Sequence, residues 1–176
     1  MTQIWRLSCL GAIPILIVID QITKWIVLKT PVFNALGCLD RTQLCGQIEV
    51  SPIFDLSMVW NRGVSFGLGQ SEGVMRWILV IVTMSIASGF AVWLWRAERR
   101  LTCAALALVV AGAAGNLIDR IRFGAVVDFF DFSDIWFVYV FNVADACITV
   151  GAVLLFVDQF LMSRKASHKA SASDHS

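Results

Sequence analysis

Four long apolar runs limit what this chain can fold into. They cover about residues 9–28, 77–95, 101–118 and 143–162. Each is close to the roughly 20 residues that a helix needs to cross a bilayer core at about 1.5 Å of rise per residue. Of the 176 residues, 58% are hydrophobic and 15% charged, and the mean hydropathy is +0.75. A soluble domain of this length would not carry four such runs, so the sequence predicts a mainly α membrane protein with four transmembrane helices.

Basic residues predict the orientation of these helices. The segment Arg96-Ala97-Glu98-Arg99-Arg100 joins the second and third runs, and Arg164, Lys165 and Lys169 follow the fourth. Positive charge at the ends of spans marks the cytoplasmic side. We therefore expect both termini in the cytoplasm and a single integral-membrane domain over residues 1–162. The same rule predicts extracytoplasmic loops at 29–76 and 119–142, and the polar composition predicts a disordered cytoplasmic tail at 163–176.

The first outer loop is expected to contain β-structure. Its alternating run has apolar Phe54, Leu56, Met58 and Trp60 against polar Asp55, Ser57 and Asn61, and Val59 interrupts the polar set. This period is typical of a strand with one apolar face, and Ile48 and Val50 precede it. We expect a small extracytoplasmic β-sheet resting on the membrane surface. Cys38 and Cys45 share the loop, and their spacing alone leaves open whether they form a disulfide.

The third run places small residues at helical spacing, at Ala104, Ala107, Ala111 and Gly115. Small side chains let helix backbones approach closely in membranes. We therefore expect this helix to be the central, tightly packed one. That position would keep Asn116, Asp119 and Arg120 inside the protein and away from lipid.

The composition argues against several classes of function. The net charge is +1, and the chain has neither a glycine-rich phosphate loop nor a basic patch interleaved with aromatics, so nothing indicates a nucleic-acid partner. The two histidines, His168 and His175, both lie in the C-terminal tail. This removes Ser-His-Asp triads, Cys-His pairs and histidine-based zinc-protease motifs from the membrane core. Carboxylates are therefore the leading candidates for chemistry there, with no metal or cofactor required.

Four acids are expected near one membrane surface. Asp119 follows the outer end of the third run, Asp145 begins the fourth, and Asp128 lies on the connection between them. Asp20 lies roughly 12 Å below the outer end of the first run, from eight residues at about 1.5 Å each. An ionised carboxylate in such surroundings is costly unless a partner or a cavity replaces its hydration. Their convergence on one side therefore indicates a function.

Two Asn-x-x-Asp spacings, Asn116–Asp119 and Asn142–Asp145, flank this region. Residues three apart share a helix face, so each amide can donate a hydrogen bond to the carboxylate that follows it. Arg120 can neutralise a neighbouring acid. Asp119 is therefore open to two interpretations, a structural ion pair or a catalyst.

The other acids differ in their cationic neighbours. Asp20 lies one helical turn from Lys24, which suits a structural or substrate-positioning role. Asp131 and Asp134 are expected to be solvated interface acids, and Asp158 a helix-end acid near the cytoplasm. Asp128 and Asp145 have no obvious cationic partner in the sequence.

Paired acids without a cation suit two functions. Two carboxyl groups in a low-dielectric site cannot both ionise easily, so one pKa rises and the pair shares a proton. One group can then activate water while the other polarises a carbonyl, which is the chemistry of aspartic proteases. A proton-coupled small membrane transporter would also use such acids. Four helices are few for a transporter monomer, however, and no inverted repeat is apparent.

Five sequence blocks add a family resemblance. In chain order they are Asp20-Gln21-Ile22-Thr23-Lys24, Asn61-Arg62-Gly63-Val64-Ser65-Phe66-Gly67, Gly115-Asn116-Leu117-Ile118-Asp119-Arg120, Val126-Val127-Asp128-Phe129 and Phe141-Asn142-Val143-Ala144-Asp145. Together they resemble lipoprotein signal peptidase (signal peptidase II), the bacterial membrane enzyme that removes signal peptides from prolipoproteins. Five ordered blocks across nearly the whole chain are a specific signal.

The resemblance implies an aspartic endopeptidase without a cofactor, in which Asp128 and Asp145 form the catalytic dyad. The residues that it implies to support the site or bind substrate are Asn116, Asp119, Arg120, Asn142, Asp20, Lys24, Asn61 and Gly63.

The resemblance also implies the substrate and the location. The substrate would be a prolipoprotein carrying diacylglyceryl on the cysteine that follows the scissile bond. Cleavage would occur near the outer leaflet of the bacterial cytoplasmic (inner) membrane. Other implied partners are membrane lipids and cyclic peptide inhibitors of the globomycin type, and we expect a monomer.

Overall fold

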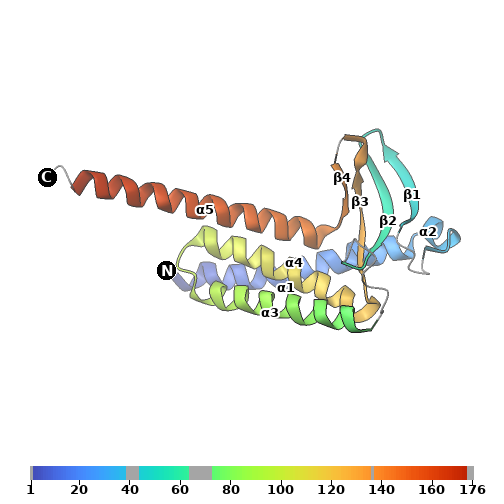
Figure 1. Ribbon diagram of the computed structural model, residues 1–176, viewed down its shortest axis with the longest axis horizontal. Helices are drawn as coiled ribbons and strands as arrows, with labels where there is room; N and C mark the ends of the chain where they lie inside the picture. The colour runs from blue at the N-terminus through green and yellow to red at the C-terminus, as the bar shows by residue number, and fades with distance from the viewer. Residues whose placement is uncertain (1, 39–43, 64–72, 136, 174–176) are drawn as a thin grey trace.

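Four long helices and a small antiparallel sheet make up the computed structural model, which describes residues 2–38, 44–63, 73–135 and 137–173 (Figure 1). The elements in chain order are α1 (Thr2–Lys29), α2 (Pro31–Ala35), β1 (Leu44–Ser51), β2 (Phe54–Asn61), α3 (Val74–Arg96), α4 (Arg100–Phe123), β3 (Val126–Phe132), the 3-10 turn η2 (Ser133–Ile135), β4 (Phe137–Phe141) and α5 (Val143–Ser173).

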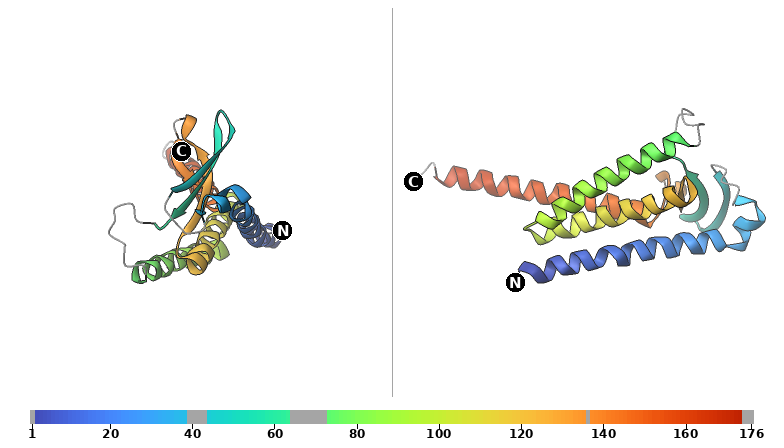
Figure 2. Two further views of the ribbon diagram at one scale, coloured as in Figure 1. Left: turned by 90° about the vertical axis from the view of Figure 1, so that its right-hand side faces the viewer. Right: turned by 90° about the horizontal axis from the view of Figure 1, so that it is seen from below.

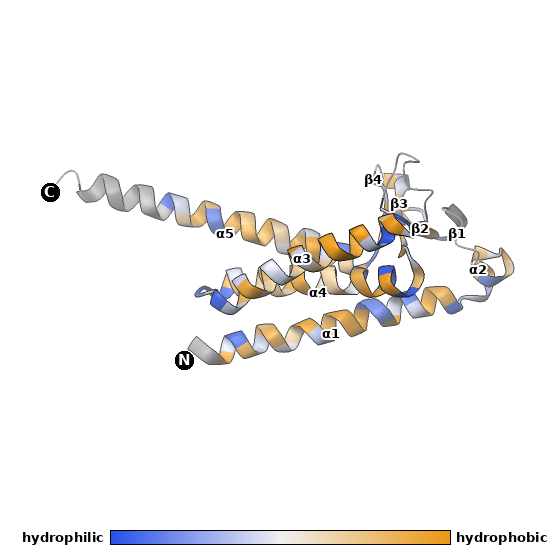
Figure 3. Cartoon of the chain, turned by 60° about the horizontal axis from the view of Figure 1, so that its bottom comes forward, coloured by the Kyte–Doolittle hydropathy of each residue, from blue (hydrophilic) through white to orange (hydrophobic). Residues whose placement is uncertain are grey.

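The helices α1, α3, α4 and α5 are each long and apolar enough to cross a membrane. Figure 3 shows apolar residues along most of their length. Many of their large apolar side chains are exposed, including Ile81 at 62% and Phe156 at 75%. Such surfaces suit contact with acyl chains rather than water. The prediction of four transmembrane helices is confirmed.

The central helix is α4, which contacts α1, α3 and α5. In α4, 61% of the most apolar window is buried, against 11–17% in the other three. Its packing against α5 depends on glycine. A Cβ at Gly112 would collide with the Ala144 carbonyl oxygen, and a Cβ at Gly151 would lie 2.7 Å from the Ala105 oxygen. The prediction that Ala104 belongs to the packed face of this helix is wrong, since Ala104 is exposed. The close contact with α5 runs through Gly112 instead.

The sheet has the strand order β1-β2-β3-β4, with every neighbouring pair antiparallel. It lies at one end of the helical bundle, opposite the end that holds the N-terminus and the α3–α4 connection (Figures 1 and 2). The predicted small sheet is therefore confirmed. The simple alternation along β2 is not, because the pairing with β3 shifts register between Leu56 and Val59. The shift buries Asp55 and Ser57 as well as Met58 and Trp60.

Two helices end later than the sequence indicated. Helix α4 continues to Phe123, where Gly124 adopts a positive φ of 79° and donates its N–H to the Arg120 carbonyl at 3.0 Å. Helix α5 continues to Ser173, so the expected disordered tail is corrected to helix for residues 163–173. The tail holds several Ala, Lys and Arg residues, which extend a helix easily once it has formed.

The cysteines divide into two groups. Cys9, Cys103 and Cys147 are free. Cys38 is disulfide-bonded, while the side chain of Cys45 lies outside the described residues.

Candidate active site

A buried ion network joins α1 to α4. Lys24 Nζ lies 2.9 Å from Asp20 Oδ2 and 2.8 Å from Asp119 Oδ2, and all three side chains are at most 2% exposed. Gln21 Nε2 donates to Asp119 Oδ1 at 3.0 Å and to Asp20 Oδ2 at 3.2 Å. The Val127 amide donates to Asp119 Oδ2 at 3.2 Å. The cation that pairs with Asp119 is therefore Lys24 from another helix, rather than the adjacent Arg120.

The same network reaches the start of α5. Asp20 Oδ1 accepts a hydrogen bond from the Ala144 amide at 2.9 Å. This amide belongs to the first turn of α5, where backbone N–H groups have no partner within the helix and favour a negative charge. Asp20 thus ties α1 to α5, and Gly115 on α4 allows its close approach, since a Cβ there would lie 2.6 Å from Asp20 Oδ2.

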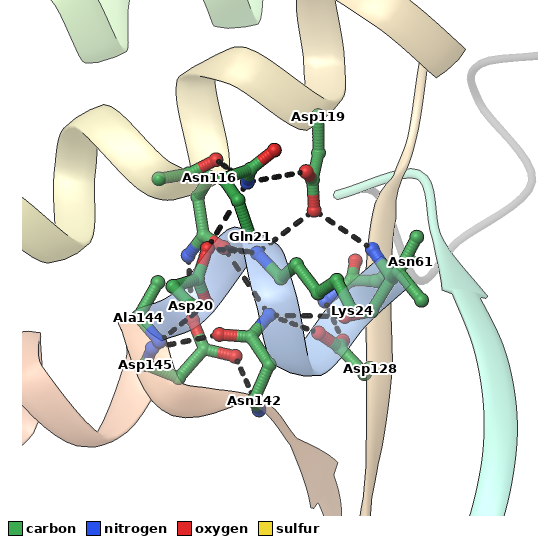
Figure 4. A network of polar contacts seen from close by, with 12 residues as sticks. Asp20, Gln21, Lys24, Asn61, Asn116, Asp119, Asp128, Asn142, Ala144 and Asp145 are labelled. Atoms are coloured by element: carbon green, nitrogen blue, oxygen red, sulfur yellow. Dashed lines mark hydrogen bonds and ion pairs between the residues drawn. The ribbon is translucent and has the colours of Figure 1, made fainter. Parts of the chain in front are cut away.

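Asp128 lies on β3 beside this network, at 1% exposure (Figure 4). Asn142 Nδ2 donates to its Oδ1 at 2.7 Å, and Asn61 Nδ2 donates to its Oδ2 at 3.0 Å. Each oxygen of Asp128 therefore accepts a hydrogen bond from a side-chain amide. Asn61 is held in turn, because its Oδ1 accepts the Gly63 N–H at 2.8 Å and Gly63 has a positive φ of 81°.

Asn142 joins the two acids. It precedes α5, and its Oδ1 accepts the Asp145 amide at 2.9 Å while Asp145 Oδ2 accepts the Asn142 amide at 3.4 Å. This reciprocal pair is a capping box. With Oδ1 used at the helix start, the side-chain amide of Asn142 is directed to Asp128. One residue thus sets the position of both carboxyl groups.

Asp145 is half-buried and receives a second amide, since Asn116 Nδ2 donates to its Oδ1 at 2.7 Å. The oxygen of Asn116 accepts from Lys24 at 3.2 Å and from Asn142 at 3.2 Å. We expected Asn116 to orient Asp119, three residues later on the same helix. That expectation is corrected, because the buried helix contacts turn Asn116 toward α5.

The electrostatics of Asp128 and Asp145 differ from those of Asp20 and Asp119. Among the described residues, neither Asp128 nor Asp145 forms an ion pair. Burial, followed by the negative charge of Asp145, raises the pKa of Asp128 to about 7, although hydrogen bonds from Asn61 and Asn142 and the charge of Lys24 act in the opposite direction. At neutral pH this pair can hold one proton between two carboxyl groups.

Arg120 is half-buried, and its guanidinium interacts electrostatically with the carboxylates of Asp145, Asp128 and Asp119. Its Nε is buried and has no hydrogen-bond partner among the described residues. A Cβ at Gly63 would lie 3.9 Å from Arg120 Nη2, which places this guanidinium beside the turn after β2. The rest of that sequence block, residues 64–67, lies outside the described residues.

An aromatic patch lies on the sheet, beyond Asp128 in the direction of β3. We define it as Phe54, Phe130, Phe132 and Phe141, which line a shallow cavity of about 280 Å³. Their ring centroids are 5.1–5.9 Å apart in four pairs. Phe130 and Phe132 follow Asp128 at two-residue steps along β3, so strand alternation places them on its face of the sheet.

The structure thus brings together every predicted site residue, although the partners differ from those expected within single helices. Gln21 was missed as a site residue, even though it stands in the first block. Its spacing to Lys24 carried a signal, since residues three apart share a helix face. Within the described part of the chain, no group of His, Cys, Asp or Glu side chains is arranged to hold a metal ion.

Two acids outside the site were also misjudged. Asp131 is 8% exposed and accepts a 2.6 Å hydrogen bond from Ser57, because the register shift in β2 buries both side chains. Burial opposes its ionisation, but the hydrogen bonds from Ser57 and Ser133 outweigh that effect and lower its pKa. Asp158 is fully buried, where it contacts Arg99 at 2.7 Å and Thr102 at 2.5 Å. Asp134 is exposed, as expected.

Known proteins share both the sequence and the fold. Residues 12–161 match the family described as signal peptidase (SPase) II. A lipoprotein signal peptidase of Caulobacter vibrioides is 41% identical over 170 residues, which cover 95% of this chain and 94% of the relative. Another from Methylorubrum extorquens is 50% identical over 112 residues, covering 62% of this chain and 66% of the relative.

A solved bacterial membrane enzyme has the same fold, with a TM-score of 0.71, 24% identity and coverage of 89% of each chain. The family match runs from within α1 to within α5 and includes all of α3, α4 and the sheet. The chain therefore belongs to the signal peptidase II family, the membrane peptidases that remove signal peptides from lipoproteins.

Proposed function

We propose that this protein is an intramembrane aspartic endopeptidase in which Asp128 and Asp145 are the catalytic residues. The observation that carries the proposal is their shared environment. Both acids are held by amides, neither forms an ion pair among the described residues, and the pKa of Asp128 is raised to about 7. These are the conditions in which one acid of a pair keeps a proton while the other ionises.

The proposed roles follow from that difference. Ionised Asp145 accepts a proton from water, and the water oxygen attacks the carbonyl carbon of the scissile peptide bond. Protonated Asp128 transfers its proton to the carbonyl oxygen, so the tetrahedral intermediate is neutral at that oxygen. As the carbon–nitrogen bond breaks, the leaving nitrogen takes the proton held by Asp145, and the hydroxyl proton returns to Asp128.

Asp20, Lys24 and Asp119 have a supporting role in this proposal. Lys24 neutralises two acids that hold α1, α4 and the start of α5 together. Asn116 donates a hydrogen bond of 2.7 Å to Asp145, and Asn142 donates one of 2.7 Å to Asp128, so both acids are fixed to this network. Rigid support keeps catalytic groups within reach of the reacting bond.

The proposed substrate is a prolipoprotein whose cysteine after the scissile bond carries diacylglyceryl. Exposed apolar helix surfaces would admit the signal peptide from the bilayer, and the aromatic patch offers an apolar surface on the Asp128 face of the sheet. Arg96, Arg99 and Arg100 lie at the opposite end of the bundle from the acids. By the positive-inside rule, both termini would be cytoplasmic and the acids would lie near the outer leaflet of the inner membrane.

The test is cleavage of a diacylglyceryl-modified precursor by purified protein in detergent, with no membrane potential or ion gradient. We expect Asp128→Asn and Asp145→Asn to remain folded and to lose cleavage by several orders of magnitude. Asp119→Asn should chiefly lower the thermal unfolding temperature. Near wild-type turnover in either dyad variant would refute the assignment, and a stable but inactive Asp119 variant would move Asp119 into the dyad.

A further inference from the structure

A second cavity lies at the end of the bundle opposite the acids. It measures about 280 Å³ and is lined by Arg6, Leu7, Leu10, Leu94, Trp95 and Cys103. These residues come from the start of α1, the end of α3 and the start of α4, which lie together at that end in Figures 1 and 2. The cavity therefore lies far from the proposed peptidase site, at the other end of the helices.

Arg6 supplies a charge with an unfilled hydrogen-bonding position. The residue is half-buried, and its guanidinium lies 5.4 Å from the Trp5 ring centroid. Its Nε is buried without a hydrogen-bond partner among the described residues. A buried donor without an acceptor is unfavourable, and an arginine fork suits a phosphate group. The site thus favours a ligand that brings an anionic oxygen.

The neighbouring charges also favour an anion. Arg99 is neutralised by Asp158, at 2.7 Å. Arg96 and Arg100 are exposed, and neither forms an ion pair with a described residue. The remaining acid of the α3–α4 connection is Glu98. The connection that follows the lining residue Trp95 is therefore net positive.

The rest of the lining is apolar and faces outward. Leu7 is 67% exposed and Trp95 71% exposed, while Leu94 and Cys103 form part of the packed core beneath them. Exposed leucine on a membrane-spanning helix suits an acyl chain, and tryptophan is typical of the level of the headgroups. Free phosphate would satisfy Arg6 but would leave this apolar surface unused.

We propose that this cavity binds one anionic phospholipid, with its phosphate on Arg6 and an acyl chain against Leu7 and Leu10. Basic pockets between transmembrane helices recognise anionic headgroups in this way. The inference is independent of the peptidase mechanism, because Arg6 lies at the start of α1, whereas Asp128 on β3 and Asp145 on α5 lie at the opposite end of the bundle.

The experiment is native mass spectrometry of the full chain in detergent, titrated with phosphatidylglycerol or with phosphatidylcholine of the same acyl chains. We expect the wild type to bind phosphatidylglycerol about fivefold more tightly. Arg6→Gln should abolish that preference. The matched control is Arg164→Gln, because Arg164 is exposed on α5, stacks on Phe160 at 4.8 Å and does not line the cavity. It should keep the preference.

Two further experiments test the phosphate and the acyl chain of the lipid separately. Inorganic phosphate at the same concentrations should not displace the lipid, since it lacks the acyl chain. Leu10→Phe narrows the cavity while keeping Arg6, and should weaken the binding of phosphatidylglycerol. Cleavage by each variant reports that it is folded. Equal wild-type affinity for the two lipids, an unchanged preference in Arg6→Gln, or displacement by phosphate would overturn the proposal.

Discussion

The raised pKa of Asp128 predicts that replacing this acid stabilises the protein at alkaline pH. Its pKa rises from an ordinary value of 3.8 to about 7, chiefly through burial and then through the charge of Asp145. Below about pH 4 the carboxyl group is protonated in both the folded and the unfolded chain. Between about pH 4 and 7 the folded chain keeps a proton that the unfolded chain has lost, so stability falls as the pH rises.

The size of this effect follows from that pH window. A difference of about 3 pH units at about 1.4 kcal/mol each gives roughly 4 kcal/mol of destabilisation above pH 7. Asp128→Asn removes the ionisation but places an NH2 group against one of two amide donors, Asn142 at 2.7 Å or Asn61 at 3.0 Å. The lost hydrogen bond costs about 1 kcal/mol. We therefore expect Asp128→Asn to be about 2–3 kcal/mol more stable than the wild type at pH 8, and about 1 kcal/mol less stable at pH 4.

The assay is equilibrium unfolding in mixed detergent micelles across pH 4–8, followed by circular dichroism. Asp134→Asn is the matched control, because it removes an exposed acid from the turn after β3. It should change the free energy of unfolding by less than about 0.5 kcal/mol at every pH. An Asp128→Asn protein less stable than the wild type at pH 8 would refute the reasoning, because ionisation of Asp128 would then carry no cost in the folded state.

Three other predictions concern the site and its support. Lys24→Met should lower the free energy of unfolding by about 3–5 kcal/mol, because it leaves two buried acids without their cation. Lys29→Met is the control, because Lys29 is exposed. Equal stability of the two variants would show that the buried ion pairs of Lys24 do not stabilise the fold. Gly115→Ala should destabilise by about 1–3 kcal/mol in the same assay, since its Cβ would lie 2.6 Å from Asp20 Oδ2, whereas Gly89→Ala meets nothing within 4 Å and should be neutral. The cleavage rate should fall as the pH rises through about 7, where Asp128 loses its proton. In Asn61→Ala this fall in the cleavage rate should occur at higher pH, because the Asn61 hydrogen bond lowers the pKa of Asp128. A fall at the same pH as in the wild type would argue against Asp128 as the catalytic acid.

Sequence patterns predicted correctly those features that depend on a single helix or strand. The four apolar runs predicted four helices because a spanning segment must satisfy its backbone internally and expose apolar side chains. The alternation around Phe54–Asn61 predicted a strand for the same kind of reason. The Asn142–Asp145 spacing is local as well, and it forms the capping box that starts α5.

Partners between elements followed no local pattern. Asn116 was expected beside Asp119 but bonds Asp145. Arg120 was one candidate cation for Asp119, and the ion pair is formed by Lys24 instead. The burial of Asp131 depends on a register shift in the neighbouring strand. Sequence spacing says which side chains share a helix face, and it does not say which face meets which neighbour.

The sequence by itself determined that this chain carries four membrane-spanning helices, that carboxylates are the leading candidates for its chemistry, and which residues stand in the family's blocks. The tertiary structure alone decided that Lys24 also reaches Asp119, and which amides hold Asp128 and Asp145. Close packing at Gly112 and Gly115 brings α1, α4 and α5 together so that Lys24 neutralises Asp20 and Asp119. The sheet places Asp128 beside Asn142 with no cation in ion-pair contact among the described residues. Charge compensation depends on distance between side chains, and only folding sets that distance.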